Sequence, residues 1–134
     1  MRELWAELDA LYGNAAPTPP QISGMEQHGA AFVLARLDGD VAGCAALRPL
    51  SRHVAEVKRV YVRRQTRRSG VARAIMHELE QLARAAGFNE IWLETGLPQS
   101  DAIRLYESLG YTRIAGFGEY KDEPDNVCFG RRLL

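Results

Sequence analysis

The sequence predicts an α/β protein in which a central mixed sheet, mostly antiparallel, is flanked by helices. Two observations support this class: runs rich in β-branched and aromatic residues, and two apolar stripes with helical spacing. A third is their order, because strand-like runs precede, separate and follow the two stripes. Strand–helix–strand units place their strands parallel, whereas hairpins pair antiparallel. We therefore expect one parallel pair within an otherwise antiparallel sheet.

The first part of the chain predicts a helix and a linker ahead of the sheet. Residues 2–12 carry Leu and aromatic side chains at spacings of three and four, which is typical of an amphipathic helix. Residues 13–24 contain Gly and three Pro, which end this helix and predict an irregular segment. Two β-like runs then flank a Gly-containing turn at residues 38–40, and they predict a hairpin.

The segment 54–62 predicts the third strand, because its residues alternate in the manner of a strand with two distinct faces. A regular strand points successive side chains to opposite faces of the sheet. One face is therefore expected to hold Val54, Glu56, Lys58, Val60 and Val62, and the other Ala55, Val57, Arg59 and Tyr61.

Two helices and three further strands complete the chain. Residues 71–86 carry an apolar stripe with helical period. Gly87 followed by Phe88 predicts a left-handed cap with a hydrophobic contact after it. The remaining elements are a strand at 90–95, a helix at 99–109 ended by Gly110, and strands at 112–120 and 126–134.

The composition predicts one soluble domain over residues 1–134. Apolar residues make up 46% and charged residues 25% of the chain, and the formal net charge is zero, so there is no general attraction to nucleic acid or to an anionic membrane. No apolar run approaches the length of a membrane span. Cys44 and Cys128 match neither a zinc spacing nor a disulfide framework. We expect a cytoplasmic protein with reduced thiols, no metal, and no nucleic-acid or membrane partner.

A basic stretch at residues 63–74, RRQTRRSGVARA, places five arginines around Gly70, between the third strand and the next helix. The first N–H groups of a helix lack internal partners, and Gly70 and the small Ala72 permit close approach of an anion. The stretch matches neither the P-loop pattern nor the three-glycine dinucleotide fingerprint. Aromatic residues do not interleave with the arginines, which disfavours a nucleic-acid surface. An anion-binding site and a solvated run of charge remain as interpretations.

The segment RRSGVA at residues 67–72 resembles the (Q/R)-x-x-G-x-(G/A) signature of the GNAT superfamily of N-acetyltransferases. EVKRVYVRRQ before it and AIRLYESLGY after it resemble the strand and the second helix that accompany this signature, so the resemblance covers residues 30–134. The resemblance implies acetyl-CoA as cosubstrate. It also implies two sets of backbone contacts: the pyrophosphate on Arg67, Arg68, Ser69, Gly70, Val71 and Ala72, and the pantetheine arm paired with Val60, Tyr61 and Val62.

The resemblance also implies catalytic roles. Tyr106 matches a tyrosine that commonly protonates the sulfur of CoA, and a phenol with an ordinary pKa of about 10 carries its proton at neutral pH. The alternative interpretation is a core tyrosine. Glu56 matches a carboxylate that many relatives use as a general base, often through water, and the alternative is a Glu paired with Arg or Lys of a neighbouring strand. Glu94 is a poorer candidate for this role. A backbone N–H near Tyr61 is expected to polarise the thioester oxygen.

Two features depart from the family pattern. Gln99 stands seven residues before Tyr106, where many relatives carry Asn, and its amide is expected to reach the cofactor. The family's first strand has no counterpart ahead of the N-terminal helix, through either a naturally short or a trimmed start. A missing edge strand invites a partner to complete the sheet, so a homodimer is an expectation. The acidic loop at residues 115–126 suits a cationic amine or forms a solvated turn.

These features predict an acetyl-CoA-dependent N-acetyltransferase that acts on a primary amine of a small molecule or peptide. The expected mechanism is direct attack without an acyl-enzyme, because neither cysteine lies in a recognisable nucleophile motif. The alternative is a non-catalytic acyl-CoA-binding regulatory module of the same fold. Both functions need the anion-binding site, and turnover of acetyl-CoA with an amine distinguishes them.

Overall fold

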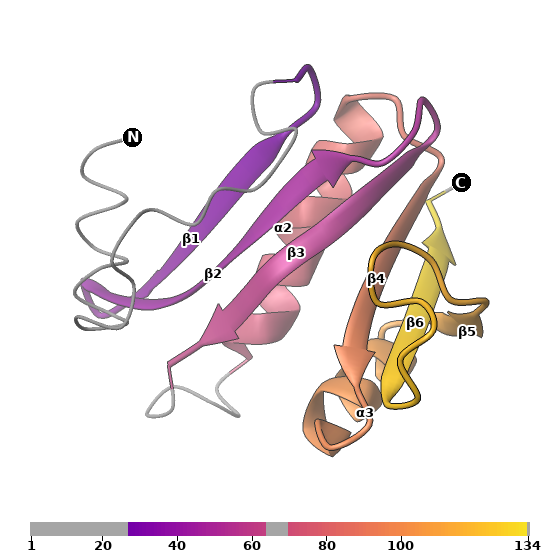
Figure 1. Cartoon of the computed structure of the whole chain (residues 1–134). Helices are drawn as coiled ribbons and strands as arrows, with labels where there is room; N and C mark the ends of the chain where they lie inside the picture. The colour runs from indigo at the N-terminus through magenta and orange to yellow at the C-terminus, as the bar shows by residue number, and fades with distance from the viewer. Residues whose placement is uncertain (1–26, 64–69, 134) are drawn as a thin grey trace.

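The structure, a computed structural model, describes residues 27–63 and 70–133. The six described strands form one sheet, and α2 packs on β1, β2 and β3 (Figure 1). The helix expected at residues 2–12 and the linker expected at 13–24 lie outside the described residues. In chain order the elements are β1 (Ala31–Leu37), β2 (Asp40–Pro49), β3 (Val54–Val62), α2 (Val71–Ala85), β4 (Glu90–Gly96), α3 (Ser100–Ser108), β5 (Thr112–Ile114) and β6 (Asn126–Arg132).

The strand order is β1-β2-β3-β4-β6-β5, and the pairing confirms the predicted mixed sheet. β3 and β4 are parallel, and each of the other neighbouring pairs is antiparallel. α2 makes the crossover between the two parallel strands, as expected for a strand–helix–strand unit. β1 and β2 form the predicted hairpin, with Asp38 and Gly39 at φ values of 54° and 87° in its turn.

The C-terminal end of α2 confirms the predicted left-handed cap. Gly87 has a φ of 92°, a conformation that glycine adopts without a Cβ penalty. The N–H of Gly87 donates to the carbonyl of Arg84, and the N–H of Phe88 donates to the carbonyl of Ala83, both at 3.0 Å. These are the two bonds of a Schellman motif, and the buried ring of Phe88 supplies its hydrophobic contact.

The second helix, α3, ends as its sequence predicts. Its last residue is Ser108, and Gly110 follows at a φ of 90°. Tyr106 is the buried residue of α3 and directs this helix onto the core. Within residues 27–63 and 70–133, neither helix is long and apolar enough to cross a membrane.

The core lies on the face of the sheet that α2 and α3 cover. Ala55 and Val57 of β3 belong to this core, together with Ile91 and Leu93 of β4. Successive side chains of a strand point to opposite faces, so the residues between them face the other way. The opposite face of these two strands therefore carries Glu56, Lys58, Glu90, Trp92 and Glu94.

A β-bulge interrupts the regular alternation of β3. Tyr61 pairs with Cys44 and Lys58 pairs with Ala46, so three steps along β3 match two steps along β2. The two backbones approach closely at this point. A Cβ atom on Gly43 would lie only 2.5 Å from the carbonyl oxygen of Tyr61. A residue without a side chain is therefore required opposite the bulge.

The bulge makes part of the predicted face assignment wrong. Val60 and Val62 were expected on the face of Glu56, but both pack against the apolar core on the helix-covered face. The extra residue also places Tyr61 on the same face as Lys58, because each pairs with a residue of β2 that points to that face. The physical reason is that one inserted residue exchanges the two faces for the remainder of the strand.

The strand predicted at residues 112–120 is also too long. β5 ends at Ile114, and turns follow it. A Cβ on Gly116 would lie 2.7 Å from the carbonyl oxygen of Lys121, and Gly118 has a φ of 76°. The backbone folds back on itself at these two glycines, which ends the pairing with β6.

Candidate active site

β3 and β4 pair only over their first four residues. The register runs from Val54 opposite Glu90 to Val57 opposite Leu93. Beyond these positions β3 remains paired with β2, and β4 remains paired with β6. The two parallel strands therefore diverge toward their C-terminal ends, as Figure 1 shows. We call this region the fork, and define it as residues 58–62 of β3 and 94–96 of β4.

The N-terminus of α2 lies at the end of the sheet where β3 ends (Figure 1). Gly70 caps this helix with φ 85° and ψ 5°, and its carbonyl accepts the N–H of Ala74 at 3.0 Å. The N–H groups of residues 71–73 have no acceptor within the helix, and the first turn carries no acidic residue. A Cβ on Gly70 would meet no atom of the described residues within 4 Å. The helix thus presents an open, electropositive end that suits a phosphate group.

The basic stretch is only partly within the described residues. The cofactor contacts predicted at Arg67, Arg68 and Ser69 fall outside them. Arg63 donates from Nη1 to the carbonyl of Val41 at 3.3 Å. Arg73 donates from Nη2 to Oγ of Ser108 at 2.7 Å and so joins the start of α2 to the end of α3. Both arginines therefore make contacts within the fold, in addition to the positive field that they contribute.

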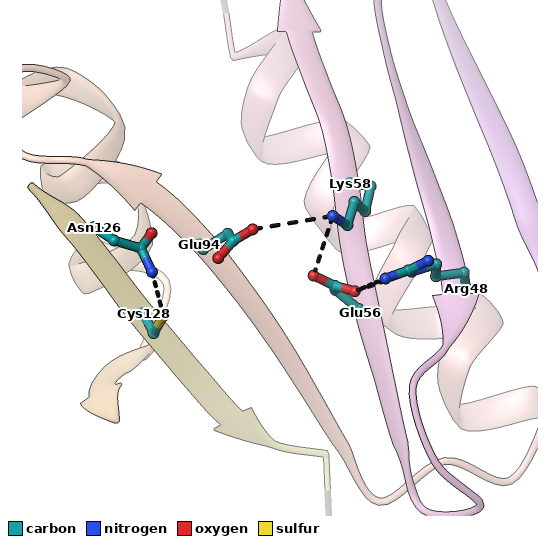
Figure 2. A network of polar contacts seen from close by, with 6 residues as sticks. All are labelled: Arg48, Glu56, Lys58, Glu94, Asn126 and Cys128. Atoms are coloured by element: carbon teal, nitrogen blue, oxygen red, sulfur yellow. Dashed lines mark hydrogen bonds and ion pairs between the residues drawn. The ribbon is translucent and has the colours of Figure 1, made fainter. Parts of the chain in front are cut away.

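Glu56 forms an ion pair with a residue of the neighbouring strand. Its side chain is 2% exposed, and its Oε1 accepts Nε of Arg48 at 3.0 Å and Nη2 at 2.8 Å. Nζ of Lys58 lies 3.7 Å from Oε2 of the same carboxylate. The cross-strand pairing considered from the sequence is therefore present. It occupies Oε1 with hydrogen bonds and leaves Oε2 facing the looser Lys58 contact (Figure 2).

Glu94 faces this pair from the other side of the fork. Its Oε1 lies 3.9 Å from Nζ of Lys58, so the ammonium group sits between two carboxylates, as Figure 2 shows. Oε2 of Glu94 is buried and has no hydrogen-bond partner among the described residues. On β6, the residue opposite Glu94 is Cys128, whose Sγ accepts Nδ2 of Asn126 at 3.4 Å.

Tyr106 lies on the other face of the sheet. Its side chain is 5% exposed, and its ring centroid lies 6.0 Å from those of Tyr111 and Phe129. Burial raises the pKa of Tyr106 from 10.0 to about 12. The hydroxyl therefore keeps its proton throughout the neutral range. Tyr106 is thus a core tyrosine by packing, and its hydroxyl is protonated at neutral pH.

The fork separates these two groups of residues. Phe129, which contacts Tyr106, pairs in register with Leu93 on the core face. Glu56 and Glu94 alternate with core residues and so lie on the opposite face. A molecule held between the diverging strands would therefore have carboxylates on one side and a phenol on the other.

Gln99 and the loop after β5 both lie near the fork. Gln99 precedes α3 as its N-cap residue, and its Nε2 lies 3.9 Å from the position that a Cβ on Gly96 would take. Gln99 is therefore beside the open end of β4. The loop after β5 brings Phe117 against Trp92, with ring centroids 5.2 Å apart. This aromatic pair covers part of the face that carries Glu94.

The sequence did not identify the partners of the two carboxylates. Arg48 lies eight residues before Glu56, and only the register of β2 with β3 places them side by side. Lys58 follows Glu56 by two residues, and this spacing on a strand was a usable signal for a shared face. A pocket of about 350 Å³ lies elsewhere, at residues 49–52 and the C-terminal end of α2, and contains none of the predicted site residues.

Comparisons with known proteins agree with this arrangement. Residues 1–111 match the family model described as the Acetyltransferase (GNAT) family. The chain is 32% identical over 136 residues to the IAA acetyltransferase of Azospirillum brasilense, covering 98% of this chain and 89% of that protein. A Klebsiella pneumoniae structure, for which acyl-CoA N-acyltransferase activity has been proposed, has a TM-score of 0.75 at 29% identity and covers 99% of this chain and 89% of its own. A proposed acetyltransferase from Salmonella typhimurium was solved with its cofactor acetyl-CoA. It has a TM-score of 0.77 at 19% identity, and the match covers 99% of this chain and 90% of that chain.

A mixed sheet that opens between two parallel strands, with a helix N-terminus at the open end, defines an acyl-CoA-dependent transferase. The family match over most of the chain identifies it further: the chain belongs to the GNAT family and is an acetyl-CoA-dependent acetyltransferase. The residues present fit this cosubstrate, because no described residue lies within 4 Å of a Cβ placed on Gly70 and the β3–β4 ladder stops at the fork. The resemblance stated from the sequence is confirmed.

Proposed function

We propose that the acceptor is a primary amine of a small molecule or peptide, and that it attacks the acetyl group directly, without an acyl-enzyme. One observation carries this proposal: the fork has the carboxylates of Glu56 and Glu94 on one face and Tyr106 on the other. An amine that enters from the carboxylate face meets a thioester in the fork, while the sulfur faces the phenol. This opposed arrangement suits a direct displacement.

The cofactor contacts proposed here are mostly backbone contacts. Gly70, Val71 and Ala72 present the open end of α2 to the pyrophosphate. The backbone of residues 60–62 lies along the fork and pairs with the pantetheine arm, and the backbone N–H near Tyr61 polarises the carbonyl oxygen of the acetyl group. The amide of Gln99 contacts the cofactor beside Gly96. Arg67, Arg68 and Ser69 keep the phosphate-binding roles expected from the sequence.

Each catalytic side chain has one task in this proposal. Acetyl-CoA, when bound, supplies an acetyl group activated as a thioester. As the N–C bond forms and the C–S bond breaks, Glu56 receives the proton of the amine through a water at its Oε2, the oxygen that does not bond Arg48. Tyr106 donates a hydrogen bond and a proton to the departing sulfur. Its raised pKa ensures that this proton is present at neutral pH.

The remaining expectations about the whole protein are also proposals. We propose that residues 1–134 act as a single domain in the cytoplasm and form a homodimer. Cys44 and Cys128 are both buried, and buried thiols suit a reducing compartment. Light scattering of the full chain tests the dimer, since a monomeric mass at micromolar concentration would contradict it.

The decisive experiment measures thiol release from acetyl-CoA in the presence of a panel of primary amines. The panel contains methylamine, 2-phenylethylamine and a short peptide with a free α-amine, and mass spectrometry checks each product for an added acetyl group. We expect saturable thiol release that depends on the amine. Tyr106→Phe should lower kcat while acetyl-CoA still raises the melting temperature of the variant. Binding of acetyl-CoA without turnover of any amine would contradict the proposal and favour a regulatory module.

A further inference from the structure

Oε2 of Glu94 is an unusual atom in this fold. It is the buried side-chain oxygen that has no hydrogen-bond partner among the described residues, on a side chain that is only 16% exposed. Buried polar atoms are almost always bonded, because desolvating a carboxylate oxygen without a partner is costly. The described residues therefore do not satisfy this acceptor, which lies at the fork where we place the reaction.

The charges around Glu94 restrict what can approach it. Facing it across the fork are Lys58, whose Nζ lies 3.9 Å from Oε1, and the Glu56–Arg48 ion pair beyond. From β6 it faces Cys128, whose sulfur is bonded by an uncharged amide. The two acids and two bases balance, so the group as a whole attracts neither cations nor anions. Among the described residues the ammonium of Lys58 makes two long ion pairs, to Glu56 and Glu94, and it is the positive charge that contacts Glu94.

We propose that Oε2 of Glu94 accepts a hydrogen bond from the N–H of the acceptor amine and so positions the nucleophile in the fork. An amine supplies the donor that this oxygen lacks. The positive charge of Lys58 beside it disfavours a second cation, and so lowers the pKa of the bound amine. Only the neutral amine has a lone pair for attack on a thioester. Glu94 thus positions the nucleophile, and Lys58 selects its reactive protonation state.

This inference rests on the proposed function and deepens it. Glu56 keeps the task of receiving the proton that the amine loses after attack, whereas Glu94 binds the amine before it. We assign the two carboxylates different roles because Oε1 of Glu56 is bonded by Arg48, whereas Oε2 of Glu94 has no hydrogen-bond partner among the described residues. The aromatic pair of Trp92 and Phe117 lies on the same face, two residues along β4, and makes 2-phenylethylamine a suitable probe.

The test compares Glu94→Gln with Glu90→Gln, a matched change on the same face of the same strand. Glu90 lies at the other end of β4, where its carboxylate accepts Nε1 of Trp92 at 3.4 Å. Binding is measured by calorimetry, by titrating the amine that wild type acetylates best into protein saturated with CoA. We expect Glu94→Gln to raise the Kd and KM for the amine about tenfold and Glu90→Gln to leave both within about twofold.

A second variant tests the role of the charge. Lys58→Met keeps the length of the side chain but removes the ammonium, so the bound amine should hold its proton more tightly. The acidic limb of the pH profile of kcat should move to higher pH by about one unit, and Glu94→Gln should move it to lower pH. A merely structural role for either residue would not shift this limb in opposite directions.

Stability separates a binding role from a structural one. In Glu94→Gln the amide oxygen can keep the long contact with Lys58, and the amide nitrogen replaces a buried oxygen that has no partner among the described residues, so the melting temperature should equal or exceed that of wild type. A marked loss of stability, or amine affinity equal to that of Glu90→Gln, would overturn the inference. Lack of turnover of any amine by wild type would instead overturn the proposed function and this inference with it.

Discussion

Nη2 of Arg48 lies 2.8 Å from Oε1 of Glu56, and this ion pair joins β2 to β3 beside the fork. The pair occupies Oε1 and leaves Oε2 as the oxygen through which we propose that Glu56 acts as a base. We expect Glu56→Gln to lower kcat about 10²-fold, because an amide cannot take up the proton of the amine. Steady-state kinetics of thiol release measure this, with the KM for acetyl-CoA expected to stay near that of wild type.

The same variant also tests the structural interpretation of Glu56. The amide oxygen of Gln can still accept from Arg48, so most of the cross-strand contact survives. If kcat changes less than threefold while the melting temperature falls by several degrees, Glu56 serves to pair Arg48 and is not the base. Circular dichroism melts recorded on the kinetic samples distinguish these results.

Gly70 and Gly87 make a matched pair at the two ends of α2. Both have a left-handed φ, 85° and 92°, and a Cβ at either would meet no atom of residues 27–63 and 70–133 within 4 Å. Changing either residue to Ala should cost about 1 kcal/mol of stability, because the strain in the backbone is the same. Only Gly70→Ala should also weaken the binding of acetyl-CoA, with a Kd about tenfold higher, since its methyl group enters the space proposed for the pyrophosphate.

Calorimetric titration of acetyl-CoA against the two variants checks this difference. Gly87→Ala serves as the control for strain in the helix. Equal affinities for acetyl-CoA in both variants would show that the pyrophosphate does not approach Gly70, and would remove the main support for the phosphate site at the start of α2.

Tyr106 predicts a dependence of stability on alkaline pH. Its pKa is about 12 in the folded protein and 10.0 when unperturbed, so the unfolded chain loses this proton first as the pH rises. The contribution is complete below pH 10 and is lost progressively between pH 10 and 12, by about 3 kcal/mol. Urea unfolding at pH 9 and at pH 11.5 should show a smaller loss for Tyr106→Phe than for wild type. Parallel losses in the two proteins would show that burial does not shift this phenol.

Short sequence patterns correctly predicted the structural elements that depend on residues close together in the chain. Gly87 and Phe88 predicted a helix cap whose two hydrogen bonds both lie within residues 83–88. No distant part of the chain is needed to form it. The order of strand, helix and strand predicted the parallel pair of β3 and β4 for a similar reason, because right-handed crossovers have few alternatives. The burial of Tyr106 followed from the apolar face of its helix, whereas its catalytic role is implied by the family resemblance alone.

Features that depend on register could not be predicted. The bulge at residues 59–60 arises from the pairing of β3 with β2, and it moved Val60 and Val62 to the face opposite that expected. The partner of Glu56 depends on the same register, since Arg48 is adjacent only once the hairpin has formed. The unbonded oxygen of Glu94 is a property of the assembled fork. A single sequence contains the residues for this site but not their pairing across strands.

The hydroxyl of Tyr111 and the guanidinium of Arg131 both donate to Glu80, at 2.8 Å and 2.7 Å, and they tie the buried side of α2 to β6 and to the start of β5. Burial and the bond to Glu80 also raise the pKa of Tyr111. Glu80→Ala should lower the free energy of unfolding by about 3 kcal/mol, near the low end for a broken buried pair because Arg131 is 31% exposed. Glu78→Ala, an exposed change on the same helix, should cost less than about 0.5 kcal/mol. The KM for acetyl-CoA should stay near that of wild type in both variants, because Glu80, Tyr111 and Arg131 lie outside residues 58–62 and 94–96 and approach the site through the ring contact of Tyr111 with Tyr106. A similar stability for the two variants in urea denaturation would show that the buried network does not hold α2 on the sheet.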